Sequence, residues 1–257
     1  RALLDDINYE EGTIRLDGKE YPLLDTMFPT IDPENPYELS AEEENIMERL
    51  VAAFTNCEKL QRHMRFLLKK GSLYKVHNNN LLYHGCVPLN EDKSFKSVEV
   101  YGKEYKGKAL YDILESYVRK AFVAIDEEER EKGKDILWFI WSSPGSPLFG
   151  KDKMATFERN FLAEKETHKE KKNPYYSLLE DEEVIDNIMK EFGIGGECSH
   201  IVNGHVPVHH TSGESPIKCD GKVLVIDGGF SKAYQKETGI AGYTLIYNSH
   251  GMRIKAH

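Results

Sequence analysis

The order of apolar and polar positions divides the chain into a loop-rich first part and a more regular remainder. In residues 11–21, short alternating runs flank Asp17-Gly18, which predicts a β-hairpin with these two residues in the turn. Three prolines between residues 29 and 36 then exclude a long helix there. We therefore expect residues 1–72 to form a loop-rich lead-in that ends in a capping helix.

That helix should begin at a capping box. The Ser40 side chain can accept a hydrogen bond from the third backbone N–H of the helix, and Glu43 can reach back to the backbone of Ser40. Apolar residues then recur at helical spacing, which predicts one helix from here to about Lys70. Gly71 is placed to end it as a C-cap.

From Leu73 onwards, strands and helices alternate. Apolar runs bounded by turn residues predict strands, and the polar alternation near residue 100 predicts a charged hairpin. The segments are strands at 73–77, 81–83, 199–202, 223–226, 243–247 and 252–254, and a hairpin at 97–106. Helices are predicted over 108–131 and 180–192, and residues 136–141 fit either a strand or a helix.

Helices that alternate with apolar strands indicate an α/β domain with a layered sheet. We expect residues 73–257 to form it, with a helical insertion at about 108–192. The acidic run Asp126–Glu131 should be the solvated end of the first insertion helix rather than a metal cage.

Composition narrows the class of protein. The chain has 43 acidic and 34 basic residues, and its net charge of −9 argues against a main role in binding nucleic acid or an anionic membrane. No apolar run approaches the roughly 18 residues of a membrane span. The four cysteines match no zinc spacing, so we expect reduced thiols in a cytoplasmic protein.

Two histidines are the candidates for chemistry. His84 and His205 each follow a predicted strand and have a glycine beside them, in the sequences LYHGC and VNGHV. The carboxyl ends of strands are where α/β proteins bind ligands, and neutral imidazole is the commonest side-chain metal ligand. The alternative is that both histidines are structural.

A third strand-to-loop junction contains Asp227, in the sequence VIDGG. Its carboxylate could orient a metal-binding histidine, or it could close an Asx-turn at the end of a buried strand. The neighbouring His209, His210 and Glu214 lie on a polar loop, where we expect solvated surface.

These junctions resemble blocks of a known superfamily. Residues 83–88 resemble the His-Gly-Gly block of the phosphoprotein-phosphatase branch of the calcineurin-like metallophosphoesterases, with Cys86 in place of the second glycine. Residues 203–205 resemble the last metal-histidine block of that superfamily, and residues 226–229 resemble the strand after it. Essentially the whole chain resembles the bacterial class III fructose-1,6-bisphosphatases, at residues 32–40, 148–151, 156–159, 166–176 and 239–244. The blocks 166–176 and 239–244 are the most specific.

The resemblance implies a fold, a metal pair and a division of roles. The fold would be part of a layered β-sandwich flanked by helices, with added helical insertions. Two divalent metals, expected to be manganese, would activate a water that attacks phosphorus. His84 and His205 would hold one of them, with Asn203 and Asp227 at the floor of the site.

The superfamily motifs Asp-x-His, Gly-Asp-x-x-Asp and Gly-Asn-His-Glu, which supply the other metal ligands and the catalytic acid, do not occur in this sequence. We therefore expect the chain to be a middle-to-late portion of a longer polypeptide. It should contact the earlier portion and be inactive alone.

A sugar bisphosphate has a second phosphate that needs a cation away from the metals. The basic stretch 151–172 follows a loop rich in glycine and proline that could act as a flap. Its charge pattern favours an exposed helix over a phosphate clamp. Within it, Lys151 and Arg159 are the candidate phosphate ligands.

The function implied by the resemblance is metal-dependent hydrolysis of the 1-phosphate of fructose 1,6-bisphosphate in gluconeogenesis. Two alternatives stay open. One keeps the two-metal chemistry but acts on a phosphoprotein or a dinucleoside polyphosphate. The other is a non-catalytic binding domain with structural histidines. We expect no nucleic-acid or membrane partner, and the sequence leaves homo-oligomerisation open.

Overall fold

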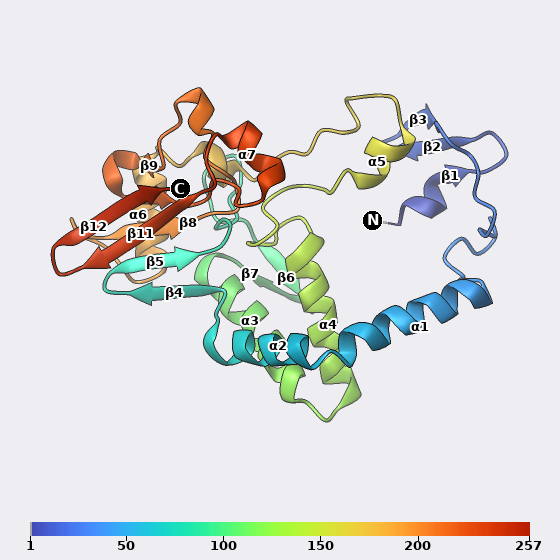
Figure 1. The fold of residues 1–257 in the computed structure, drawn as a ribbon, viewed down its shortest axis with the longest axis horizontal. Helices are drawn as coiled ribbons and strands as arrows, with labels where there is room; N and C mark the ends of the chain where they lie inside the picture. Colours follow the sequence, from blue (N-terminus) through green and yellow to red (C-terminus); the bar gives the residue numbers. More distant parts are fainter. Residues whose placement is uncertain (1) are drawn as a thin grey trace. The chain divides into compact units, whose positions relative to one another are not determined.

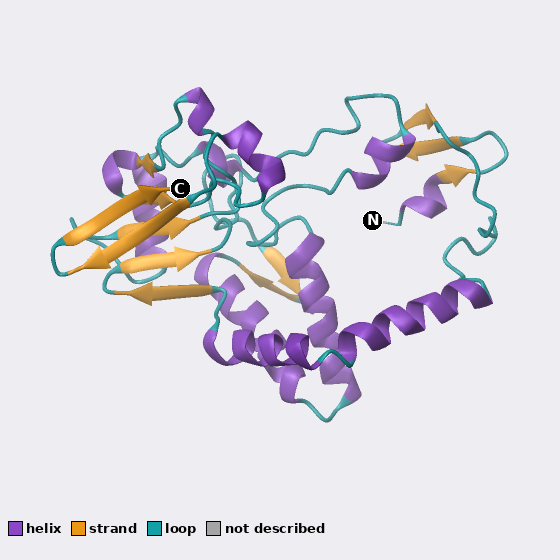
Figure 2. Cartoon of the chain, in the orientation of Figure 1, coloured by secondary structure: helices purple, strands orange, loops and turns teal. Residues whose placement is uncertain are grey.

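The computed structural model describes residues 2–257, which divide into two units (Figures 1 and 2). Unit 1 comprises Arg1–Gly71 and Met154–Glu170, and unit 2 comprises Ser72–Lys153 and Lys171–His257. Both helices and strands are abundant, which confirms the expected mixed α/β class. All four cysteines are free.

Unit 1 contains a small antiparallel sheet. After a short 3-10 helix, its strands are β1 (Ile7–Asn8), β2 (Thr13–Leu16) and β3 (Lys19–Pro22). The turn between β2 and β3 has positive φ at both Asp17 and Gly18, which is the backbone that a tight two-residue hairpin requires. The predicted hairpin is therefore confirmed. Its buried side chains pack against Leu162, directly after α5 (Thr156–Phe161).

Two helices replace the single one predicted over residues 40–70. They are α1 (Ala41–Thr55) and α2 (Glu58–Lys70), and no residue of either helix is buried. The capping box forms as expected, because Ser40 and Glu43 exchange hydrogen bonds between side chain and backbone. The continuous helix was wrong at Asn56-Cys57, where two residues of low helix propensity follow Thr55 and Cys57 has extended backbone.

Unit 2 is organised by a five-stranded sheet within residues 72–257. The strands are β4 (Tyr74–His77), β5 (Asn80–Tyr83), β8 (His200–Asn203), β10 (Val223–Val225) and β9 (Ile217–Lys218), in that spatial order. The three middle strands run parallel to one another, and the outer two pair antiparallel to them. Both faces of a parallel strand are covered, which explains why β10 is a wholly buried apolar run and why every residue of β8 except His200 is buried.

The predicted long helix over residues 108–131 is also two helices. They are α3 (Gly107–Val123) and α4 (Glu127–Ser142). The acidic run opens α4 instead of ending α3, because the Asp126 carboxylate accepts from the Glu129 N–H and acidic side chains stabilise a helix N-terminus. Residues 136–141, which fitted a strand or a helix, are helical.

Helices α3 and α4 form a second hydrophobic cluster of unit 2. Leu110, Leu114, Ile136 and Ile140 pack with the hairpin β6 (Val98–Val100) and β7 (Lys103–Tyr105). A Cβ on Gly133 would lie 1.9 Å from the Cβ of Ala121, so the two helices approach closely where that glycine lies. The predicted charged hairpin is confirmed.

The basic stretch is not the exposed helix that its charge pattern favoured. Only Thr156–Phe161 is α-helical, and Asp152 and Lys171 exchange backbone and side-chain hydrogen bonds. The like-charged pair Glu166 and Glu170 at helical spacing gives no support to a longer helix.

The remaining elements complete unit 2. Helix α6 (Glu182–Glu191) matches its prediction, with Gly193 in left-handed backbone beyond its end. The hairpin β11 (Tyr243–Asn248) and β12 (Gly251–Ala256) was expected as two strands, whereas α7 (Lys232–Thr238) was not predicted. Across residues 2–257, every helix is too short or too polar to span a bilayer.

Candidate active site

Sheet topology brings three predicted site residues to one edge. His84 follows β5, His205 follows β8 by two residues, and Asp227 follows β10 by two residues. Because these strands are parallel and adjacent, their carboxyl ends share one edge of the sheet. Backbone hydrogen bonds extend beyond the strands there: Gly204 N–H donates to His84 O at 3.0 Å, and Ile226 N–H donates to Asn203 O at 2.9 Å.

The two histidine rings face each other. His84 Nε2 lies 3.0 Å from His205 Nδ1, and the ring planes make an angle of 71°. His205 Nε2 lies 3.0 Å from the Phe149 carbonyl oxygen, which can only accept. In the neutral ring the proton is therefore assigned to Nε2, and Nδ1 of His205 directs its lone pair at His84.

Burial favours the neutral form of both imidazole rings. Desolvation by the surrounding protein is the main cause that lowers the pKa of His84 and of His205, although His84 keeps an exposed edge. The nearby Asp227 carboxylate opposes the lowering in both cases. A pKa below the ordinary 6.5 leaves the imidazole unprotonated, which is the form that binds metals.

His205 is held in a sparsely populated backbone conformation. Its φ is +69°, in the left-handed region that non-glycine residues rarely adopt. Such a conformation costs about 1–3 kcal/mol and persists where the surrounding structure imposes it. Here the Phe149 contact and the Gly204 hydrogen bond to His84 hold the residue in place. Backbone strain of this kind concentrates at functional sites.

The separation of the two nitrogens suits shared coordination of one ion. Two imidazole nitrogens bound at about 2.1 Å to the same metal, at angles near 90–110°, lie about 3.0–3.4 Å apart. The pair therefore fits as two ligands of a metal when the His84 proton lies on Nδ1, because both facing nitrogens then carry lone pairs. Within residues 2–257, however, no group of three or more His, Cys, Asp or Glu side chains is placed to hold an ion.

Cys86 does not add a ligand or a nucleophile. Burial raises the pKa of its thiol to about 12, so the reactive thiolate is not formed near neutral pH. The residue packs in the core of unit 2 instead.

Asn203 is buried behind the histidines, at the end of β8. Its amide nitrogen donates to Gly85 O at 3.1 Å and to the Tyr175 hydroxyl at 3.0 Å. The Tyr175 hydroxyl also bonds the Tyr83 hydroxyl at 2.7 Å. This network ties the loop after β5 to the loop after β8. The tyrosines were not anticipated, because nothing in the sequence separates them from ordinary core aromatics.

We expect Tyr175→Phe to lower the free energy of unfolding by about 1–3 kcal/mol, because it leaves the buried Tyr83 hydroxyl and one N–H of the Asn203 amide without a partner. Urea unfolding of the chain measures this. Tyr247→Phe is the control, since that ring is exposed, and it should change stability by less than about 0.5 kcal/mol. Equal effects of the two substitutions would contradict the role of the network.

The predicted phosphate ligands lie in different units. The Lys151 ammonium is 5.2 Å from the centroid of the Phe149 ring, and its charge contributes to lowering the pKa of His205. Lys151 is thus close to the histidine pair. Arg159 belongs to unit 1, where it forms an ion pair with Glu170 at 3.4 Å.

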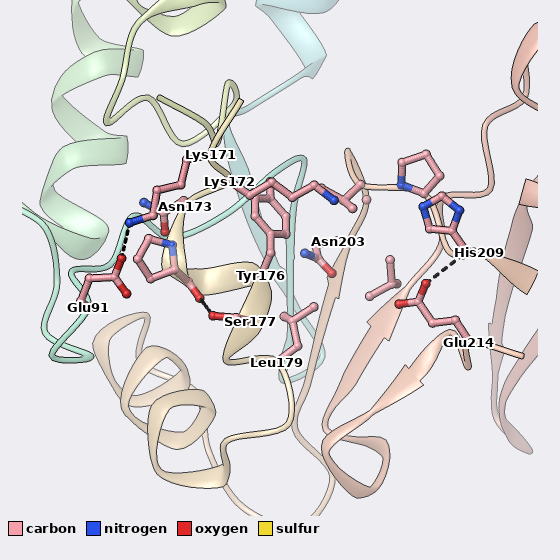
Figure 3. Close-up of a pocket in the computed structure, with 15 residues that line it drawn as sticks. Glu91, Lys171, Lys172, Asn173, Tyr176, Ser177, Leu179, Asn203, His209 and Glu214 are labelled. Carbon is pink, nitrogen blue, oxygen red and sulfur yellow. Dashed lines mark hydrogen bonds and ion pairs between the residues drawn. The ribbon is translucent and has the colours of Figure 1, made fainter. Parts of the chain in front are cut away.

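A cavity of about 350 Å³ adjoins the loop that carries His205 (Figure 3). Gly204 and Val206, on either side of His205, are among its lining residues. His209 and Glu214, which were expected on solvated surface, also line it. The His209 backbone N–H donates to the Glu214 carboxylate at 2.8 Å. The sequence carried no signal for this cavity, because its walls come from segments far apart along the chain.

Comparison with known proteins agrees with the predicted family. A family model described as Firmicute fructose-1,6-bisphosphatase matches residues 1–257. The chain is 58% identical to a class 3 fructose-1,6-bisphosphatase of Clostridioides difficile, 56% identical to that of Clostridium acetobutylicum and 52% identical to that of Listeria innocua. Each alignment covers 100% of this chain but only 39–40% of the relative. No solved structure matches the chain. Because the family model covers its whole length, this chain belongs to the Firmicute fructose-1,6-bisphosphatase family.

Proposed function

We propose that the polypeptide containing this chain removes the 1-phosphate of fructose 1,6-bisphosphate, in gluconeogenesis. The observation that carries the proposal is identity of 52–58% over the whole chain to proteins named as class 3 fructose-1,6-bisphosphatases. The facing imidazoles of His84 and His205 support it, because they suit a metal-dependent phosphoester hydrolase.

His84 and His205 would hold one divalent metal, for which we propose manganese. When bound, such a metal supplies Lewis-acid stabilisation of the phosphoryl oxygens. This chain's own residues position the two rings. The Phe149 carbonyl accepts from His205 Nε2, and Asn203 fixes the backbone beyond β5 by its bond to Gly85. The other ligands would come from polypeptide beyond these 257 residues.

Several finer assignments belong to the same proposal. Asp227, which accepts from the Gly229 N–H at 2.9 Å, would form the floor of the site and supply negative charge beside the histidines. Lys151 and Arg159 remain the predicted phosphate ligands. The sheet of unit 2 would be one part of a calcineurin-like sandwich, in contact with the earlier portion of the polypeptide. Free thiols favour the reducing cytoplasm, and homo-oligomerisation remains a prediction.

The test is phosphate release by the protein at the full length of its relatives. We expect one phosphate released per fructose 1,6-bisphosphate in the presence of manganese, loss of activity with a chelator, and recovery when manganese is restored. A phosphopeptide and a dinucleoside tetraphosphate are the comparison substrates, and faster release from either would overturn the proposal. The 257-residue chain alone should show no turnover.

A further inference from the structure

The cavity adjoins the backbone on both sides of His205. His205 turns its ring towards Phe149 and His84, whereas its neighbours Gly204 and Val206 line the cavity. Consecutive Cα atoms are about 3.8 Å apart, so the cavity wall at Gly204 and Val206 lies one residue along the chain from the His205 Cα. Gly204 has no side chain to thicken the wall there.

The cavity presents a polar side and an apolar side. Lys172, Asn173 and His209 contribute polar groups, while Leu179, Val206 and Val225 contribute carbon surface (Figure 3). Small-molecule sites typically combine such carbon surface with a few placed polar groups. The volume of about 350 Å³ lies within the range of such sites.

Lys172 brings an uncompensated positive charge to the cavity. Within residues 2–257, its ammonium makes no hydrogen bond or ion pair, and Figure 3 shows its side chain extending over Asn203. The other charges are paired. Lys171 binds Glu91 at 2.6 Å, and Glu214 binds Lys218 at 2.9 Å. The cavity is therefore complementary to an anion.

Asn203, which also lines the cavity, has a hydrogen-bond acceptor without a partner among the described residues. The residue is only 2% exposed and its amide nitrogen is occupied, but its Oδ1 has no hydrogen-bond partner among the described residues. In Figure 3 this oxygen faces the cavity, away from Tyr176. A buried acceptor without a partner costs free energy, which a hydroxyl donor on a ligand would recover.

We propose that this cavity binds the sugar 6-phosphate end of the substrate, with Lys172 on the phosphate that is not hydrolysed and Asn203 Oδ1 accepting from a sugar hydroxyl. The inference rests on the proposed function, since it names how that substrate is held. A phosphorylated sugar supplies both features that the cavity lacks, an anion and hydroxyl donors. Lys151, beside Phe149, is then left for the phosphate at the histidine pair.

Steady-state kinetics of the full-length protein test this with a matched pair of lysines. Lys172→Met should raise KM for fructose 1,6-bisphosphate about 10- to 100-fold and change kcat far less, as expected for loss of one charge-assisted contact. Lys171→Met, next to it but paired with Glu91, should change KM less than about threefold. Lys172→Arg should keep KM near the wild-type value, because it restores the charge.

Failure of the inference about the cavity can be told apart from failure of the proposed hydrolase function. If the wild type hydrolyses fructose 1,6-bisphosphate but Lys172→Met and Lys171→Met have the same KM, the cavity is not the sugar-phosphate site. If the wild type does not hydrolyse that substrate, the proposed function fails, and calorimetric titration with fructose 6-phosphate decides about the cavity. If the wild type and Lys171→Met bind fructose 6-phosphate and Lys172→Met does not, the result supports the inference about the cavity. If the wild type does not bind fructose 6-phosphate, the inference is refuted.

Discussion

Replacing His84 with alanine should lower kcat for fructose 1,6-bisphosphate by about a thousandfold or more in the full-length protein, because metal ligation contributes several kcal/mol of transition-state stabilisation. The fold should survive. His84 lies at the exposed end of β5, and its ring contacts His205 rather than the core. Phosphate release, metal content per chain and the unfolding midpoint should be measured on the same preparation.

His77→Ala is the matched control for this substitution. His77 ends the neighbouring strand β4 with an exposed side chain, and the Asn80 side chain donates to its backbone oxygen rather than to its ring. Its replacement should leave both activity and metal content near wild type. If His84→Ala retained full metal content and near wild-type kcat, the assignment of the histidine pair as metal ligands would have to be abandoned.

Replacing Gly85 with alanine should lower the free energy of unfolding by about 1–3 kcal/mol, the usual cost of forcing atoms into a packed site. A Cβ on Gly85 would lie 2.4 Å from the Pro147 carbonyl oxygen, so one of two backbone segments has to move. The adjacent Cys86 N–H donates to that same oxygen at 2.9 Å. Because His84 precedes Gly85, we also expect weaker metal binding.

Gly195→Ala provides the comparison. A Cβ at Gly195 would meet no atom within 4 Å, and its backbone is outside the left-handed region. Stability should therefore change by less than about 0.5 kcal/mol. Urea unfolding of both variants measures the difference, and equal stability would show that the loop between β5 and Val87 relaxes freely.

Local features of this chain were predictable where a few neighbouring residues decide the structure. The Asp17-Gly18 turn and the Ser40 capping box form as expected, because each depends on backbone preferences and hydrogen bonds within four residues. Helix ends inside charged or mixed segments were less predictable. Helical periodicity alone did not separate α3 from α4 at the Asp126–Glu131 run; the capping bond of Asp126 to the Glu129 N–H decides that α4 begins there.

In the candidate site, too, some features were predictable from the sequence and others were not. Sequence blocks identified the family and singled out His84, His205 and Asp227 at strand ends, but not the partners of those residues. The Phe149 carbonyl, the Tyr175 hydroxyl and the free ammonium of Lys172 carry no sequence signature.

By itself, then, the sequence determined the class of fold and most strands, and it singled out the histidines predicted to bind a metal, because such properties follow from side-chain chemistry and short-range periodicity. Only the tertiary structure decided that His84 and His205, 121 residues apart, meet at 3.0 Å, and that Lys172 extends over Asn203, whose Oδ1 has no partner among the described residues. The physical reason is that those contacts depend on which strands pair in parallel. Strand pairing is settled by burial of both sheet faces across the whole unit rather than by any local pattern.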